Sequence, residues 1–158
     1  MSTPRLKKLL HLKFSDFSLF IQSVYYLALS KRKIKRSSFK DVAPTLGGLN
    51  QEIRKELSNS EYAIAEKIRL ATMRASRVVP FRSVCMDQAM AGVILLKKHH
   101  IPCTMFLGVR KREEEIGLDA HAWVVCGEKI VLGGQKSLFY TVTARFANNF
   151  TTTISEEK

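Results

Sequence analysis

Cysteine is scarce in this sequence, and its three copies, Cys85, Cys103 and Cys126, form no closely spaced pair. Without a Cys-x-x-Cys motif, a zinc site built from these residues and His121 is disfavoured. A disulfide framework is disfavoured as well, because the number is odd and the first residues, MSTPRLKKLLHLKF, lack the apolar stretch of a secretory signal. We therefore expect a cytoplasmic protein whose cysteines are free for chemistry, with neither a metal ion nor another cofactor.

Long apolar runs and phosphate-cradling glycine motifs are also missing. The apolar segment at residues 17–29 is shorter than the about 20 residues that span a bilayer, and polar side chains interrupt it. No P-loop is present, so ATP is not expected as a ligand. With 158 residues, of which 46% are hydrophobic, the chain has the length and composition of one globular domain that needs no disulfide to fold.

Positive charge is in excess, but it is concentrated at one end of the chain. The formal net charge is +12, and residues 1–40 carry ten Lys or Arg against one Asp, which leaves a net +3 for the rest. The densest run extends from Lys31 to Arg36. This distribution predicts an acidic partner, or peripheral contact with an anionic membrane, for the N-terminal arm only. A nucleic-acid-binding module is a distant alternative, because no aromatic residue is interleaved with the basic run.

Helical periodicity dominates the first part of the chain. Recurring apolar residues predict helices over residues 17–29, about 49–78 and about 83–98. We expect the first helix to pack on the core, with a membrane-surface helix as the alternative. The second is expected to be interrupted near Ser58, because Ser58 and Glu61 have the spacing of a capping box.

The last third of the chain has the composition of β-structure. Runs rich in Val, Ile, Thr and aromatic residues predict strands over residues 103–109, 120–126, 129–132 and 138–143. A tight connection through Gly127 and Glu128 predicts an antiparallel hairpin. Helices followed by a small antiparallel sheet define an α+β fold. We expect residues 1–48 to form a basic amphipathic helical arm, residues 49–146 the main domain, and residues 147–158 a frayed tail.

Cys85 is the candidate nucleophile, because it lies near the start of the third expected helix, where free backbone N–H groups stabilise a thiolate. A base must take the proton of the thiol and return it to the leaving amine, which suits histidine. His11 lies in the N-terminal arm, and His99 and His100 lie at the far end of the helix that begins near Cys85. His121 is therefore the remaining candidate for the base. His121 shares a strand face with Trp123, whose ring can shield it from water. On residue types alone, a structural cysteine and histidine are the alternative.

Four local sequences give this pair a context. They are RSVCMDQAMA (82–91), LLKKHHIP (95–102), FLGVR (106–110) and AHAWV (120–124). In order and spacing they resemble the leader peptidase of lasso-peptide biosynthesis. The similarity spans about residues 65–134, and its most specific part is Cys-x-x-x-Ala followed by His-Ala-Trp-Val.

The resemblance implies a transglutaminase-like (papain-type) fold and a cysteine protease with Cys85 as nucleophile and His121 as base. The implied reaction is removal of the leader peptide through a thioester acyl-enzyme. Family members are either fused to a leader-recognition domain or stand alone, and the weak strand signal before residue 80 makes this chain similar to the stand-alone type. The implied partners are the precursor peptide, a separate leader-recognition protein and, in the pathway, the lasso cyclase.

The third member of the implied site has no clear match. Such enzymes typically place an Asp on the strand after the histidine strand, whereas KIVLGGQ (129–135) holds no carboxylate. Gln135 is our first choice for orienting His121, with Glu128, Asp119 or a backbone carbonyl as alternatives. The alternative activity is a transglutaminase-like acyl transfer to another peptide or protein, in which an amine captures the thioester instead of water.

Overall fold

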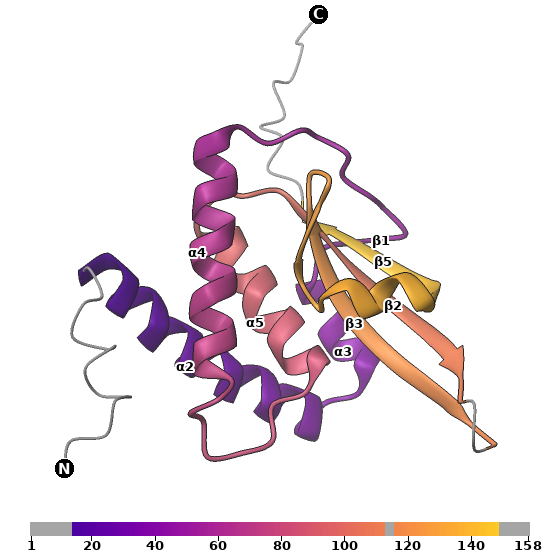
Figure 1. Cartoon of the computed structure of the whole chain (residues 1–158). Helices are drawn as coiled ribbons and strands as arrows, with labels where there is room; N and C mark the ends of the chain where they lie inside the picture. The colour runs from indigo at the N-terminus through magenta and orange to yellow at the C-terminus, as the bar shows by residue number, and fades with distance from the viewer. Residues whose placement is uncertain (1–13, 113–115, 149–158) are drawn as a thin grey trace, which may run out of the picture.

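Helices gather on one side of the protein and strands on the other (Figure 1). The computed structural model describes residues 14–112 and 116–148. The long helices are α2 (Phe14–Arg36), α4 (Asn59–Ala75) and α5 (Cys85–Lys98), and the short ones are α3 (Phe39–Val42) and the 3₁₀ turns η1 (Ala43–Thr45) and η2 (Gln135–Phe139).

The sheet has five strands, and every neighbouring pair is antiparallel. In chain order they are β1 (Gly48–Leu49), β2 (Cys103–Lys111), β3 (Leu118–Cys126), β4 (Lys129–Leu132) and β5 (Thr141–Asn148). Their order across the sheet is β1-β5-β2-β3-β4, which leaves β4 at an edge beside β3. This arrangement confirms the predicted α+β fold and the predicted hairpin.

Helix α5 lies at the centre, with β3 on one side and α2 and α4 on the other (Figure 1). Its apolar residues Ala89, Val93 and Leu96 are each at most 1% exposed. A helix covered from two sides needs apolar residues over more than one stripe, and α5 has them. The helix is therefore a fixed platform for its own first residue, Cys85.

Helix α4 is shorter than the sequence predicts. It begins at Asn59, and the predicted capping box is confirmed, because Ser58 Oγ accepts from the Glu61 N–H (3.3 Å) and the Glu61 carboxylate accepts from the Ser58 N–H (2.7 Å). The expectation of helix over residues 51–58 is wrong. That segment is held to the sheet instead, where the Ile53 N–H donates to Thr104 Oγ1 (2.9 Å).

Helix α2 extends beyond the predicted range in both directions and takes in the basic run. It packs on α4 and α5, which confirms the prediction of a helix packed on the core. The buried face agrees only in part with the expected apolar stripe. Leu27 of that stripe is buried, but Phe17 and Ile21 are 46% and 50% exposed, and Leu19, Ser23 and Ser30 are buried as well. Small serine side chains at the contact allow neighbouring helices to approach closely. Within the described ranges, no helix is long and apolar enough to cross a membrane.

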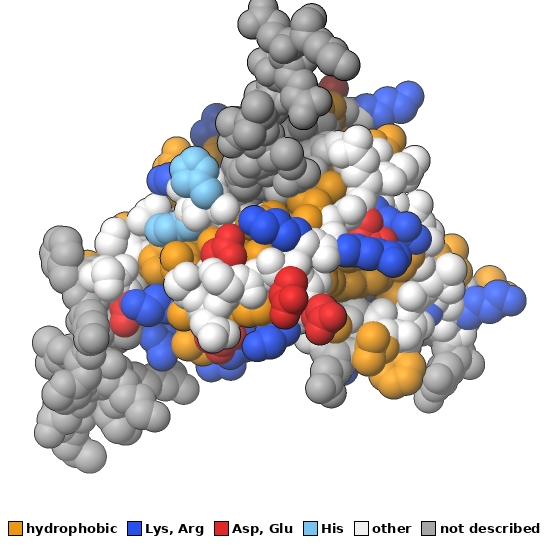
Figure 2. Space-filling model, turned by 90° about the horizontal axis from the view of Figure 1, so that it is seen from above, with side chains coloured by type: hydrophobic (Ala, Val, Ile, Leu, Met, Phe, Trp, Pro, Cys, Tyr) orange, Lys and Arg blue, Asp and Glu red, His pale blue; other side chains and the backbone are white. Residues whose placement is uncertain are grey.

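The end of the described chain differs from the sequence expectation in two places. The predicted strand at 138–143 begins only at Thr141, because η2 occupies residues 135–139, where Ser137 Oγ donates to Gly134 O (2.8 Å). Residues 147 and 148 belong to β5 rather than to the predicted tail, and the remainder of that tail lies outside the described residues. The face drawn in Figure 2 shows basic and acidic side chains interspersed among the described residues.

Candidate active site

Cys85 is the first residue of α5, with Val84 rather than Ser83 as the N-cap residue. The N–H groups in the first turn of a helix have no acceptor within the helix, and they carry the positive end of its dipole. A thiolate at this position is therefore stabilised by the backbone itself. The side chain of Cys85 is half-buried and lines a cleft.

The other two cysteines are placed quite differently. Cys103 and Cys126 lie on β2 and β3 and are buried in the core. Burial raises the pKa of the Cys103 thiol to about 12 and also raises the pKa of Cys126. Both thiols therefore stay protonated at neutral pH, and neither is suited to act as a nucleophile. Of the three cysteines, Cys85 is the one that the fold places at an accessible cleft.

His121 lies on β3, and its ring is held by the backbone of the next connection. Its Nε2 lies 2.9 Å from the carbonyl oxygen of Gly133, in the segment that follows β4. A carbonyl can only accept a hydrogen bond, so Nε2 carries the proton and donates it. In a neutral ring, Nδ1 is then the nitrogen with the free lone pair. Nδ1 is thus available to act as a base.

Gly133 is required at this position by the close approach of the loop to β3. Its φ is +95°, and a Cβ there would overlap the side chain of Trp123 and lie 3.0 Å from the Ala122 carbonyl oxygen. A larger residue would therefore move the loop and its carbonyl away from His121. The Gly-Gly pair signals a turn in the sequence, but nothing in it indicates the hydrogen bond to His121.

Two aromatic rings contact the imidazole of His121. The Trp123 ring lies 5.9 Å away at 20°, and the Tyr140 ring lies 5.0 Å away at 32°. The contact with Trp123 was predicted from their shared strand face and is confirmed. Tyr140, which follows η2, was missed, because only the fold of that segment brings it to β3. The Arg110 guanidinium lies 5.0 Å from the centre of the Tyr140 ring and extends this stack.

Cys85 and His121 line the same open cleft, with a volume of about 850 Å³. One wall is the face of α4 that carries Tyr62, Ala65, Glu66, Arg69 and Met73, and the opposite wall is β4 with the glycines that follow it. Gln88, one turn along α5 from Cys85, also lines it. The lining of the cleft thus comes from α4, α5, β3, β4 and the segment that follows β4.

The three predicted orienting side chains fall in different surroundings. Asp119 is paired with Arg112 (3.0 Å) and Arg110 (3.4 Å), and the hydrogen bond from Arg112 is the main reason that its pKa is lowered. Glu128 is exposed in the turn between β3 and β4. Gln135 begins η2, and its side chain is outside the described part, so its predicted role remains a prediction. Among the residues that the structure describes, no group of three or more His, Cys, Asp or Glu side chains could hold a metal ion.

Comparison with known families agrees with the fold. Residues 29–145 match the model of the Transglutaminase-like superfamily, and because the match covers most of the chain, the protein belongs to this superfamily. The superfamily comprises cysteine-protease-like enzymes with peptidase or acyltransferase-type activity. The matched region begins within α2 and so includes part of the predicted arm. No match was found among curated proteins or among solved structures.

Proposed function

We propose that this protein is a cysteine peptidase that removes the leader from a lasso-peptide precursor through a thioester acyl-enzyme. The observation that carries the proposal is the shared cleft of Cys85 and His121, in which the Gly133 carbonyl holds His121 in the tautomer of a base. The four local sequences around these residues support the assignment of the substrate. A separate leader-recognition protein would present the precursor, and the lasso cyclase would use the released core peptide.

The proposed reaction uses both residues twice. His121 Nδ1 accepts the Cys85 thiol proton, and the thiolate attacks the scissile carbonyl carbon at the end of the leader. When the tetrahedral intermediate collapses, the imidazolium returns its proton to the amine of the core peptide, which leaves. Nδ1 then takes a proton from water, and the hydroxide cleaves the thioester to release the leader with a free carboxylate and restore the thiol.

The partner of His121 Nε2 is the uncharged carbonyl of Gly133, and this affects the rate of the proposed reaction. A backbone carbonyl fixes the orientation of the imidazole, but it stabilises the imidazolium less than a carboxylate would. The rings of Trp123 and Tyr140 shield the histidine from water, which strengthens the remaining hydrogen bond. We therefore expect a slow peptidase, suited to a substrate that is delivered by a partner and cleaved once.

Mass analysis of a candidate precursor, incubated with and without the leader-recognition protein, tests the proposal. We expect a leader fragment with a free carboxylate, which is absent with Cys85→Ala. Adding a primary amine separates the two activities of the superfamily. If the leader is recovered only as its amide with that amine, the protein is an acyltransferase and the proposed peptidase function is wrong.

A further inference from the structure

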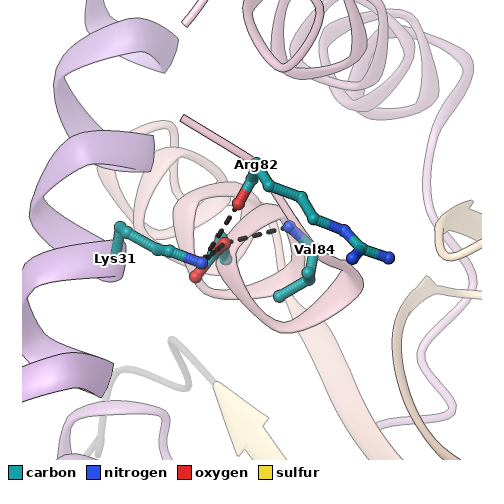
Figure 3. A network of polar contacts seen from close by, with 4 residues as sticks. Lys31, Arg82 and Val84 are labelled. Atoms are coloured by element: carbon teal, nitrogen blue, oxygen red, sulfur yellow. Dashed lines mark hydrogen bonds and ion pairs between the residues drawn. The ribbon is translucent and has the colours of Figure 1, made fainter. Parts of the chain in front are cut away.

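A partly buried ion pair joins α2 to the helix that begins with Cys85 (Figure 3). Lys31 Nζ on α2 lies 3.3 Å from Asp87 Oδ2 on α5. The side chain of Asp87 is completely buried, and that of Lys31 is 36% exposed. A carboxylate is rarely buried without a partner, because removing its charge from water is unfavourable, so this pair is a specific feature of the fold.

The contacts of this pair converge on the segment that leads into Cys85. Asp87 Oδ2 accepts a hydrogen bond from the Val84 N–H (2.9 Å), and Lys31 Nζ donates to the Arg82 carbonyl (3.0 Å) as well as to Asp87. Figure 3 shows the side chain of Lys31 extending from α2 toward the Arg82 carbonyl, to which a dashed line joins it. Two backbone atoms just before Cys85 are thus fixed by one lysine and one carboxylate.

The charges in this pair also bear on the thiolate. Asp87 lies two residues after Cys85, in the same first turn of α5. An uncompensated carboxylate there would partly cancel the positive potential at the start of the helix. It would therefore disfavour the formation of a negative charge on sulfur. The ammonium group of Lys31, 3.3 Å from Asp87 Oδ2, compensates this carboxylate.

We propose that Lys31 is a positioning residue for the nucleophile, which acts through Asp87 and the backbone of residues 82–84. The basic run in α2 would then serve catalysis as well as docking, because its first member reaches the start of α5. The inference rests on the proposed role of Cys85. The reactivity of the thiol can nevertheless be measured without a peptide substrate.

The chain offers a matched control in a second ion pair of α2. Lys67 Nζ lies 3.3 Å from Asp16 Oδ1, the same separation as in the Lys31–Asp87 pair, and it joins α2 to α4 instead of α5. Lys67→Met therefore removes a lysine that holds α2 in place but leaves the entry to Cys85 intact. Asp16 is 29% exposed whereas Asp87 is completely buried, so Lys31→Met should cost more stability, and the two variants are compared at a temperature at which both are fully folded.

The first experiment measures alkylation of Cys85 by iodoacetamide at pH 7, followed by mass analysis of the labelled peptide. We expect Lys31→Met to slow labelling about tenfold or more, Lys31→Arg to stay within about threefold of the original rate, and Lys67→Met within about twofold. Equal effects of Lys31→Met and Lys67→Met, or no effect of either, would overturn the inference. If Lys31→Met does not fold, Lys31→Gln, which keeps a donor without the charge, takes its place.

The second experiment measures precursor cleavage by the same variants. We expect Lys31→Met to lower kcat about tenfold and to change KM less than twofold, since the lysine does not line the cleft. A change confined to KM would contradict a positioning role. The two proposals can fail separately. If Lys31→Met alters alkylation but the protein never cleaves a precursor, only the proposed function is refuted. If Lys31→Met leaves alkylation unaltered in an active peptidase, only the role of Lys31 is refuted.

Discussion

The two catalytic residues that we propose are held in place by different means. The segment before Cys85 is fixed by charged side chains, because Lys31 and Asp87 bind its backbone from two helices. His121 is fixed by a backbone carbonyl, that of Gly133, and by aromatic rings. The nucleophile should therefore respond to changes of charge. The base should respond only to changes that move the loop after β4.

The largest expected effect comes from removing either member of the pair. Cys85→Ser and His121→Ala should each reduce precursor cleavage at least about a thousandfold, because each removes a bond-making or proton-transfer step. Thermal unfolding should show that both variants keep their fold. Cys126→Ala is the control, and it should retain activity at temperatures where it is folded. Cleavage by Cys85→Ser at a rate similar to that of the unmodified protein would refute the assignment.

The three cysteines provide the next test, in which the nucleophile is identified by its reactivity. With a pKa of about 12, Cys103 is ionised to roughly one part in ten thousand at pH 8, and the raised pKa of Cys126 keeps its ionised fraction low too. Iodoacetamide at pH 8 should therefore label Cys85 first. Since a raised pKa delays ionisation, labelling of Cys103 should rise only as the pH approaches 12 or the protein unfolds. Labelling of Cys103 or Cys126 before Cys85 in the folded protein would contradict this order.

Substitution of Gly133 should disrupt the hydrogen bond that holds the imidazole of His121. Gly133→Ala should reduce the cleavage rate about a hundredfold and destabilise the fold by about 1–3 kcal/mol, because its Cβ overlaps Trp123 at a positive φ. Gly134→Ala is the matched control. Gly134 also has a positive φ, +66°, but a Cβ there has no neighbour within 4 Å. If both variants lose activity equally, backbone strain or a narrower cleft explains the loss, and the contact with His121 does not.

Much of this site could be predicted from the sequence, for physical reasons that also explain what was missed. Cys85 and His121 stand out because a helix start and a strand face are local properties that a few neighbouring residues define. Trp123 follows from the two-residue period of a strand. The contacts of Lys31 with Asp87 and of Tyr140 with His121 join distant segments, and no local pattern encodes them.

The fold shows the same division between local and distant interactions. The capping box at Ser58 and the hairpin between β3 and β4 were predicted correctly, because each depends on residues a few positions apart. The segment at 51–58 was predicted as helix but is bonded to Thr104, and η2 replaced the start of the expected last strand. In the first case a partner elsewhere in the chain outweighed the local preference, whereas η2 is held by local hydrogen bonds such as that from Ser137 Oγ to Gly134 O.

The smallest expected effects concern the side chains that the sequence offered as orienters of His121. Because the Gly133 carbonyl already accepts the proton of Nε2, Asp119→Asn, Glu128→Gln and Gln135→Ala should each change the cleavage rate by less than about threefold. Asp119 is the least available of them, since its lowered pKa keeps it ionised and paired with Arg112 at neutral pH.

Gln135 is the most informative of the three variants, because the sequence made it the first choice and predicts that its loss slows the enzyme without abolishing activity. The pH dependence of kcat for Gln135→Ala, measured beside that for Gly133→Ala, shows whether the Gln135 amide or the Gly133 carbonyl orients His121. If the Gly133 carbonyl alone sets the tautomer of His121, Gln135→Ala leaves the profile unchanged and only Gly133→Ala distorts it. A loss of about a hundredfold in Gln135→Ala, with Gly133→Ala nearly silent, would transfer the orienting role to the glutamine amide. The base would then depend on a side chain, as the nucleophile does, and the contrast between the two anchors would disappear.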